Sequence, residues 1–160
     1  MKEFLDTALN TATANGADYA DIRISRHKNQ SIRTRENRIQ SISNSESYGF
    51  GVRVLVDGTW GFAASHRLTK NNVAKITMRA MEIARANRVV QLIPIRLAEV
   101  ESYEAQWNSP IIKDPFEVSI NEKIDLLLTV NAEALKIKGA KYCSSSMLFM
   151  NEEKHFASTE

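Results

Sequence analysis

Three histidines and one cysteine are the residues of this chain whose side chains most often bind metal ions or act as nucleophiles. His27, His66 and His155 are far apart in the sequence, and none has a second histidine three to five residues away. A zinc-binding helix needs such a pair, because residues four apart share one face of the helix. The chain therefore lacks a local zinc motif, and we predict neither a metal ligand nor a catalytic residue within it.

The remaining nucleophiles and the glycines also lack the surroundings that chemistry requires. Cys143 has only Lys141 as a nearby cation in sequence, whereas a reactive thiol needs a helix N-terminus or several cations to lower its pKa. The serines at 144–146 are not flanked by the glycines of a nucleophile elbow. Gly49 and Gly51 lead into a strand pattern and not into a helix, so they predict a bend or bulge and not a phosphate loop.

Arginine and lysine are concentrated between Asp21 and Arg38. Six cations stand against two carboxylates there, a local charge of 6 − 2 = +4. Two interpretations stay open: a surface that binds an acidic partner such as a peptide carboxylate, or an exposed edge strand that its charges protect from aggregation. No aromatic residue lies within the run, which argues against nucleic-acid binding. With two residues of a later strand, the candidate contacts to a peptide or partner are Arg23, Arg33, Arg35, Arg53 and Trp60.

The composition is that of a globular domain. The chain has 160 residues, 43% of them hydrophobic, and a formal net charge of +2. Its length fits about one domain, and its charge is too balanced to indicate a nucleic-acid or membrane partner. It begins with charged residues instead of a signal peptide and has no run of roughly 18 apolar residues, so we expect a soluble, cytoplasmic protein.

Hydrophobic periodicity predicts the elements that carry these residues. Residues 1–14 repeat apolar side chains at helical spacing. The period then changes to two, with Ala20, Ile22 and Ile24 alternating with polar residues, which predicts a strand with one buried face. A turn at residues 35–37 leads into a second strand.

The clearest local signal is a hairpin with Asp57-Gly58 at its turn, where both central residues need a positive φ. The register places Leu55 opposite Trp60 and Arg53 opposite Phe62. Trp60 should therefore lie in a packed interface, in the core or at a subunit contact. The other face pairs valines with small residues, which leaves room for a helix to pack closely. These pairs are Val54 with Gly61 and Val52 with Ala63.

The second half of the chain begins with a helix that Thr69 would cap. A proline-containing connection follows at residues 91–118, with a short strand at 95–98 as one alternative. A Ser-x-x-Glu capping box at Ser119 then starts a third helix, and the last strands are expected at 141–150 and 154–158. The order α-β-β-β-α-(loop)-α-β-β favours an α+β fold with a largely antiparallel sheet and helices packed on it.

Several blocks together resemble one family, TldD/PmbA. Residues 16–23, Gly-Ala-Asp-Tyr-Ala-Asp-Ile-Arg, are similar to its junction between the first helix and the first strand. Residues 47–54 and 57–65 look like its Gly-x-Gly-x-Arg hairpin, and an alanine-rich helix follows at the expected distance. The Gly-Val-Arg and Gly-Phe-Ala forms are closer to TldD than to its paralogue PmbA, also called TldE.

The resemblance implies a function that these residues do not themselves display. TldD members are longer zinc metallopeptidases, in which a C-terminal His-Glu-x-x-x-His helix and a later cysteine bind the metal. No residue here matches those positions, so the resemblance implies that residues 1–160 form a single N-terminal domain, with zinc and catalysis in an absent C-terminal domain. Within it we expect a core at 1–90, the connection at 91–118 and a helix with strands at 119–160.

The same resemblance implies partners. It predicts that the domain shapes a chamber that admits peptides or unfolded proteins, as a homodimer or as a heterodimer with a TldE/PmbA-like subunit. The strand pattern continues to Glu160, so we expect a longer gene product. The alternative is a stand-alone protein- or peptide-binding regulatory module of the DNA gyrase modulator type.

Overall fold

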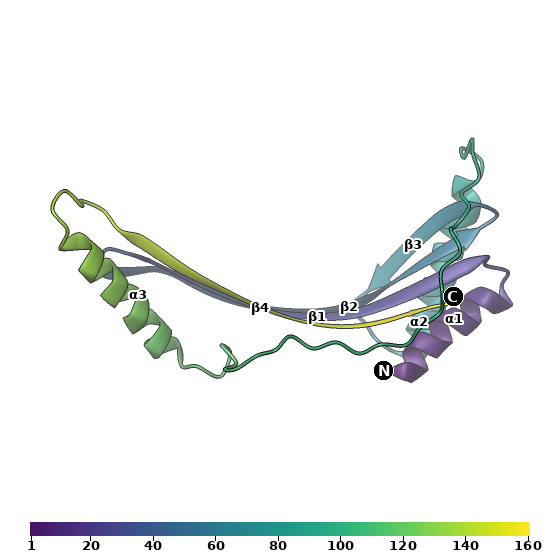
Figure 1. Ribbon diagram of the computed structural model, residues 1–160. Coiled ribbons are helices and arrows are strands. Elements are labelled where there is room, and N and C mark those ends of the chain that lie inside the picture. Colours follow the sequence, from purple (N-terminus) through teal and green to yellow (C-terminus); the bar gives the residue numbers. More distant parts are fainter. The chain divides into compact units, whose positions relative to one another are not determined.

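The computed structural model describes all 160 residues, which form three helices and four strands (Figure 1). The strands form one antiparallel sheet in the order β3-β2-β1-β4, which confirms the α+β prediction. None of the helices is long and apolar enough to cross a membrane. In chain order the elements are α1 (Lys2–Ala14), β1 (Tyr19–Arg35), β2 (Arg38–Val56), β3 (Thr59–Ser65), α2 (Lys70–Asn87), α3 (Ile120–Leu135) and β4 (Ser144–Ser158).

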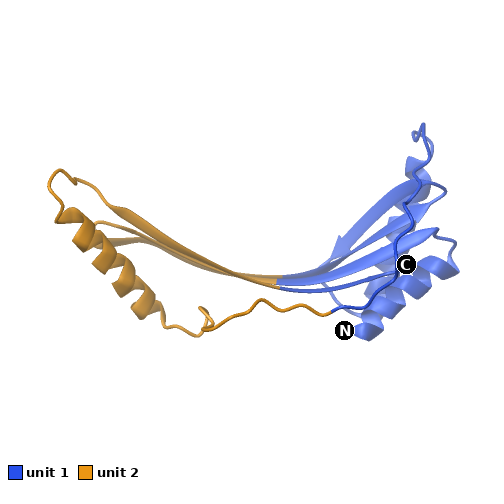
Figure 2. Cartoon of the chain, in the orientation of Figure 1, with its two compact units in different colours: residues 1–26, 48–105, 153–160 blue, residues 27–47, 106–152 orange.

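The chain divides into two compact units (Figure 2). Unit 1 comprises residues 1–26, 48–105 and 153–160, and unit 2 comprises residues 27–47 and 106–152. Strands β1, β2 and β4 each contribute residues to both units, so the units are not consecutive stretches of sequence.

Unit 1 has an apolar core between its part of the sheet and helices α1 and α2. The strand residues predicted to be buried, Ala20, Ile22 and Ile24, are at most 1% exposed. They pack with valines of β2 and with small side chains of both helices. Thr69 caps α2 as predicted, because its hydroxyl accepts a hydrogen bond from the Asn72 amide at 3.3 Å.

The β2–β3 hairpin has the predicted turn and register. Asp57 and Gly58 both have positive φ, at 49° and 72°. Leu55 pairs with Trp60, and Val54 pairs with Gly61. Helix α2 passes so close to Gly61 that a Cβ atom there would lie 2.0 Å from the Ala80 carbonyl oxygen. The small residue therefore permits the closest packing between α2 and the sheet.

Unit 2 is built on α3, which Ser119 caps as predicted. Its apolar core is small: Ile32, Ile124 and Leu127, with partly buried neighbours. A polar residue, Asn131, is fully buried beside this core. Its amide nitrogen donates to the Thr34 hydroxyl and to the Glu36 carbonyl, both at 3.0 Å.

The side-chain oxygen of Asn131 completes this polar cluster. It accepts from the Ser145 hydroxyl at 2.5 Å and from the Cys143 thiol at 3.2 Å. Cys143 therefore takes part in a structural hydrogen bond. The amide of Asn131 ties α3 to β1 through Thr34, to the turn after β1 through Glu36, and to β4 and the residue before it through Ser145 and Cys143.

Three sequence-based expectations differ from the structure. Residues 154–158 do not start a separate strand, because β4 is continuous through residues 151–153. The connection contains no strand at 95–98, although the Ile95 amide donates to the Gly58 carbonyl at 2.8 Å. The basic run on β1 is not an edge strand, because β1 lies between β2 and β4. Its charges consequently do not protect an open sheet edge, and a peptide could not extend the sheet at β1.

Candidate functional site

The sheet face of unit 1 opposite α1 and α2 carries a cluster of charged and aromatic side chains, which we call the open face. Cross-strand pairs place Arg53 beside Phe62, and Leu55 beside Trp60, on this side. Alternation along the strands explains the arrangement, since successive side chains point to opposite faces and the valines between them enter the core. The residues that define the open face are Tyr19, Asp21, Arg23, Arg53, Trp60, Phe62 and Phe156.

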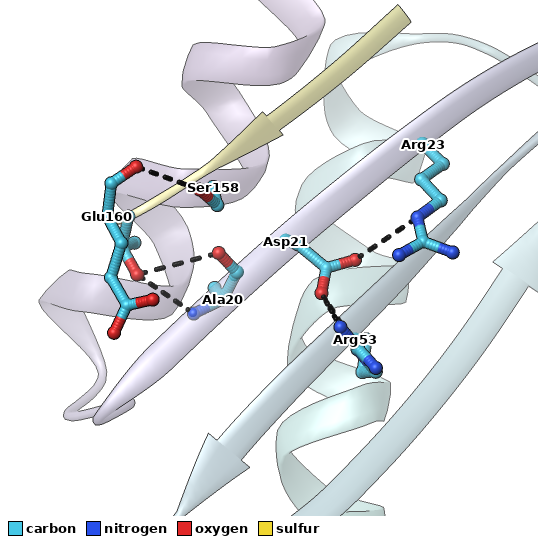
Figure 3. A network of polar contacts seen from close by, with 7 residues as sticks. Ala20, Asp21, Arg23, Arg53, Ser158 and Glu160 are labelled. Carbon is cyan, nitrogen blue, oxygen red and sulfur yellow. Dashed lines mark hydrogen bonds and ion pairs between the residues drawn. The ribbon is translucent and has the colours of Figure 1, made fainter. Parts of the chain in front are cut away.

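Asp21 lies at the centre of the open face, and its side chain is only 3% exposed. One of its oxygens, Oδ2, accepts a hydrogen bond from Nε of Arg53 at 2.7 Å and lies 2.6 Å from Nη2 in the same ion pair (Figure 3). Oδ1 lies 3.8 Å from Nε of Arg23. A buried carboxylate needs such partners, because an unpaired charge away from water is costly. Asp21 therefore fixes the position of the Arg53 guanidinium.

Trp60 and Tyr19 pack against this ion pair. The Arg53 guanidinium carbon lies 4.5 Å from the centre of the Trp60 ring, a cation–π distance, and the Tyr19 ring meets Trp60 edge-on at 5.7 Å. Burial raises the pKa of Tyr19 above its ordinary value of 10.0, and the charge and hydrogen bond of Asp21 add to that rise. Burial is the largest single influence on the pKa of Arg53 and would lower it, but the hydrogen bonds and charges of Asp21 and Tyr19 together outweigh burial and raise it.

Arg23 extends the site towards β4. Its guanidinium carbon lies 5.4 Å from the centre of the Phe156 ring, and the side chain of Arg23 is 54% exposed. The open face thus has two arginines, each beside an aromatic ring, around one buried carboxylate. Their formal charges sum to 2 − 1 = +1. Such an arrangement can bind an anionic group by hydrogen bonds from arginine and an apolar group by contact with the rings.

The structure brings together three of the five residues predicted to bind a peptide or partner. Arg23, Arg53 and Trp60 share the open face. Arg33 and Arg35 belong to unit 2, where both are exposed. There Arg35 lies 3.7 Å from the Glu36 carboxylate and its guanidinium stacks over the Tyr142 ring.

Sequence reasoning missed Asp21, Tyr19 and Phe156 as members of this site. Asp21 entered only the charge count of the basic run. Its position two residues from Tyr19 and two from Arg23 is a usable signal, because residues at this spacing on a strand share one face. Phe156 has no such signal, since it reaches Arg23 from the far end of the sequence.

The side chains of this chain do not fit a zinc site. No group of three or more His, Cys, Asp and Glu residues lies close enough together to hold a metal ion. His27 is 3.9 Å from the Glu152 carboxylate, and His155 is 3.1 Å from that of Glu153, so each imidazole is near one carboxylate. A tetrahedral structural site needs four ligands and a catalytic site needs three.

The part of the chain that contains the hairpin is similar to the first domain of a known protein family. Residues 20–84 match the family model of the PmbA/TldA metallopeptidase domain 1. A metalloprotease of Methanocaldococcus jannaschii is 27% identical over 111 residues, which are 69% of this chain and 25% of that protein. A metalloprotease of Synechocystis is also 27% identical, over 67% of this chain and 22% of its own length. The chain thus spans about a quarter of the length of these relatives.

Solved structures share the fold of nearly the whole chain. A Thermotoga maritima protein named for modulation of a DNA gyrase superposes with a TM-score of 0.77 at 18% identity, over 99% of this chain and 35% of its own. TldE from Thermococcus kodakarensis superposes with a TM-score of 0.68 at 16% identity, over 98% of this chain and 35% of its own. At these identities the likeness shows the fold. The family model over residues 20–84 and the metalloprotease relatives make the chain similar to the N-terminal domain of the TldD/PmbA family, and the solved structures have the same fold.

Proposed function

We propose that this chain is the non-catalytic N-terminal domain of a TldD-type zinc metallopeptidase that processes peptides or unfolded proteins in the cytoplasm. In this proposal the domain forms part of the wall of a chamber and contacts a partner subunit. Zinc and the residues that activate water belong to a C-terminal domain. The match of residues 20–84 to the first metallopeptidase domain supports this proposal most directly. That the chain spans only about a quarter of its metalloprotease relatives is consistent with it.

The open face is the part of this domain best suited to meet a peptide. Neither α1 nor α2 covers this face, and the side chains of Phe62 and Phe156 on it are each more than half exposed. Exposed aromatic rings beside arginines are typical of protein and peptide interfaces. A peptide that enters the chamber would bury these rings, so the domain would contribute substrate binding and no chemistry.

The decisive experiment uses the full gene product that contains this chain. We expect it to bind about one zinc ion per chain at a site outside residues 1–160 and to cleave an unstructured peptide. Phe62→Ala should raise KM for that peptide several-fold with kcat little changed, because an interaction of equal strength in the ground state and the transition state affects binding alone. Glu82→Ala, on the exposed surface of α2, is the matched control and should leave both constants unchanged.

Two results would contradict the proposal. The first is a gene product that neither binds zinc nor cleaves peptides. The second is cleavage by residues 1–160 alone. A regulatory module that binds a protein or peptide without cutting it would give the first result, and it is the alternative that the gyrase-related names of the structural relatives favour.

A further inference from the structure

The geometry of the open face points to a specific ligand: we propose that Arg53 and Arg23 bind the C-terminal carboxylate of a peptide whose last residue is apolar. This proposal deepens the proposed function, because it names the chemical group that the non-catalytic domain recognises. It rests on three features of the open face: a fixed guanidinium with unused donors, a local excess of positive charge, and aromatic surface on both sides of the arginines.

The first feature is the guanidinium of Arg53. Arginine has five N–H donors in a rigid plane. The Nε donor bonds to Asp21, Nη2 lies 2.6 Å from the same oxygen, and a third donor can be set aside for Tyr19, whose hydroxyl also raises the pKa of Arg53. At least 5 − 3 = 2 donors are left for a ligand. Contact with the Trp60 ring and the bonds to Asp21 hold the plane in place, so little conformational freedom remains to be lost when a ligand binds.

The second feature is charge. Asp21 balances one of the two arginines, and the cluster keeps a formal charge of +1. Asp21 cannot itself serve a cationic ligand well, because its side chain is 3% exposed and Arg53 occupies one of its oxygens. The exposed charge that a ligand meets is therefore that of the guanidinium groups, which bind carboxylates through paired N–H donors.

The third feature is the aromatic surface. Phe62 lies directly opposite Arg53 on β3 and is 59% exposed, and Phe156 lies beside Arg23 on β4 and is 51% exposed. Adjacent strands are about 4.8 Å apart, so donors and rings are neighbours on one small surface. At a peptide C-terminus the carboxylate and the last side chain branch from the same Cα atom. A terminal apolar residue therefore matches this spacing better than an aspartate or glutamate, whose carboxylate ends the side chain itself.

Tryptophan fluorescence offers a direct test on the whole chain. The chain has two tryptophans, so Trp107→Phe leaves Trp60 as the single reporter, in contact with Arg53. The probes are three forms of one short alanine peptide: a free acid that ends in phenylalanine, its C-terminal amide, and an amide that carries an internal glutamate. We expect the free acid to bind at least tenfold more tightly than either amide.

Substitutions of Arg53 and Arg23 test whether these arginines cause the preference for the free acid. Arg53→Lys keeps the charge but loses the planar pair of donors, and should reduce the preference for the free acid several-fold. Arg23→Gln removes a half-exposed side chain whose ion pair is long, so the fold should tolerate it, and binding of the free acid should fall. Arg79→Gln, on α2, removes an equal charge away from the open face and should change nothing. Circular dichroism of each variant checks that it is folded.

Equal binding of the acid and its amide would overturn the inference, as would equal or tighter binding of the glutamate-containing amide. Either outcome would leave the peptidase proposal intact if the full gene product still binds zinc and cleaves peptides. Conversely, a preference for the free acid in a protein without peptidase activity would reject the proposed function and keep the carboxylate site.

Discussion

The two units hold their parts of the sheet by different physical means. In unit 1 the buried residues are nearly all apolar or small, and α2 reaches the strands because Gly61 has no side chain. In unit 2 only three apolar residues are buried, and hydrogen bonds of two buried polar residues of the helix, Lys123 and Asn131, join it to the strands. Close packing of apolar and small side chains thus stabilises unit 1. Unit 2 depends on buried hydrogen bonds, whose donors and acceptors would find no other partner if one of them were removed.

The two units also differ in the position of their buried polar side chains relative to the helices. Unit 1 places its buried charge, Asp21, on the sheet face away from the helices, where arginines satisfy it. Unit 2 places its buried polar group between helix and sheet. A buried amide with all its partners specifies one arrangement of α3, because a rotated or shifted helix would leave those groups unpaired. The arginines that satisfy Asp21 in unit 1 are partly exposed and therefore available for binding, whereas Asn131 is fully buried.

The largest expected effect comes from filling the space between α2 and β3. Gly61→Ala would put a Cβ atom 2.0 Å from the Ala80 carbonyl oxygen and 2.6 Å from the Ala84 amide nitrogen. Both are backbone atoms, so the whole helix must move. We expect the free energy of unfolding to fall by about 4 kcal/mol, at the upper end for overpacking. Urea unfolding with an unchanged m-value would measure it.

Gly51→Ala is the matched control, since it makes the same change in the same sheet on the opposite face. The added Cβ atom meets only the edge of the Phe62 ring, at 2.9 Å. That ring is more than half exposed and can swing aside, so the cost should stay below about 1 kcal/mol. Similar losses for the two variants would show that close packing against α2 is not what stabilises unit 1.

Much of unit 1 could be predicted from the sequence because its signals are local. The alternation of Ala20, Ile22 and Ile24, the Asp57-Gly58 turn and the small residue at 61 each act within a few residues of the chain. The register, the buried face and the close helix followed from them, and the structure confirms all three.

Unit 2 was less predictable because its decisive contacts are not local. The spacing of apolar residues in α3 by itself would place Val130 on the buried face, yet Val130 is 48% exposed and Asn131 is buried. An asparagine in a helix is ordinarily read as a solvent-facing residue. Its burial here depends on Thr34, which lies 97 positions away in sequence, and no periodic pattern reports such a pair.

The candidate site shows the same division. Arg53 and Trp60 were found because the hairpin register places them on one face. Asp21 and Arg23 were identified only as part of a charged run, although the structure gives Asp21 the central position. Arg23 lies on the open face and Arg33 does not, although they are ten residues apart on one strand. This difference could not be predicted, because β1 passes from one unit into the other between them.

The second prediction tests the polar cluster of unit 2. Asn131→Leu keeps a similar volume but leaves the Thr34 and Ser145 hydroxyls and the Glu36 carbonyl without this partner. We expect a loss of about 2–3 kcal/mol, the cost of buried polar groups left unsatisfied. Amide hydrogen exchange should locate the effect, with faster exchange in α3 and at the start of β4 and little change in α1.

Asn121→Ala removes an amide from the exposed start of the same helix and should cost little, which separates the loss of burial from the loss of an asparagine as such. If Asn131→Leu were as stable as the parent chain, apolar packing would suffice in unit 2. The contrast between the two units would then disappear.

The smallest expected effect concerns the pH dependence that the open face gives to unit 1. Burial, together with Asp21, raises the pKa of Tyr19, and tyrosine is charged only after it loses its proton. The folded chain therefore holds this proton more tightly than the unfolded chain does. The resulting stability is complete below the unfolded pKa of about 10 and is lost as the pH rises through the folded pKa. Tyr19→Phe should flatten the fall in unfolding free energy above about pH 10.

Absorbance at 295 nm gives an independent measure of the same group. Because the pKa of Tyr19 is raised, Tyr19 should ionise above its ordinary value of 10.0, and this phase should be missing in Tyr19→Phe. Tyr103→Phe is the control, because Tyr103 is 86% exposed and is not part of the open face, so this variant should keep the phase that Tyr19→Phe loses. If both variants removed the same phase, Tyr19 would not be held neutral beside Asp21. The charged groups of the open face would then be held in place less tightly than the distances between Asp21, Arg53 and Trp60 indicate.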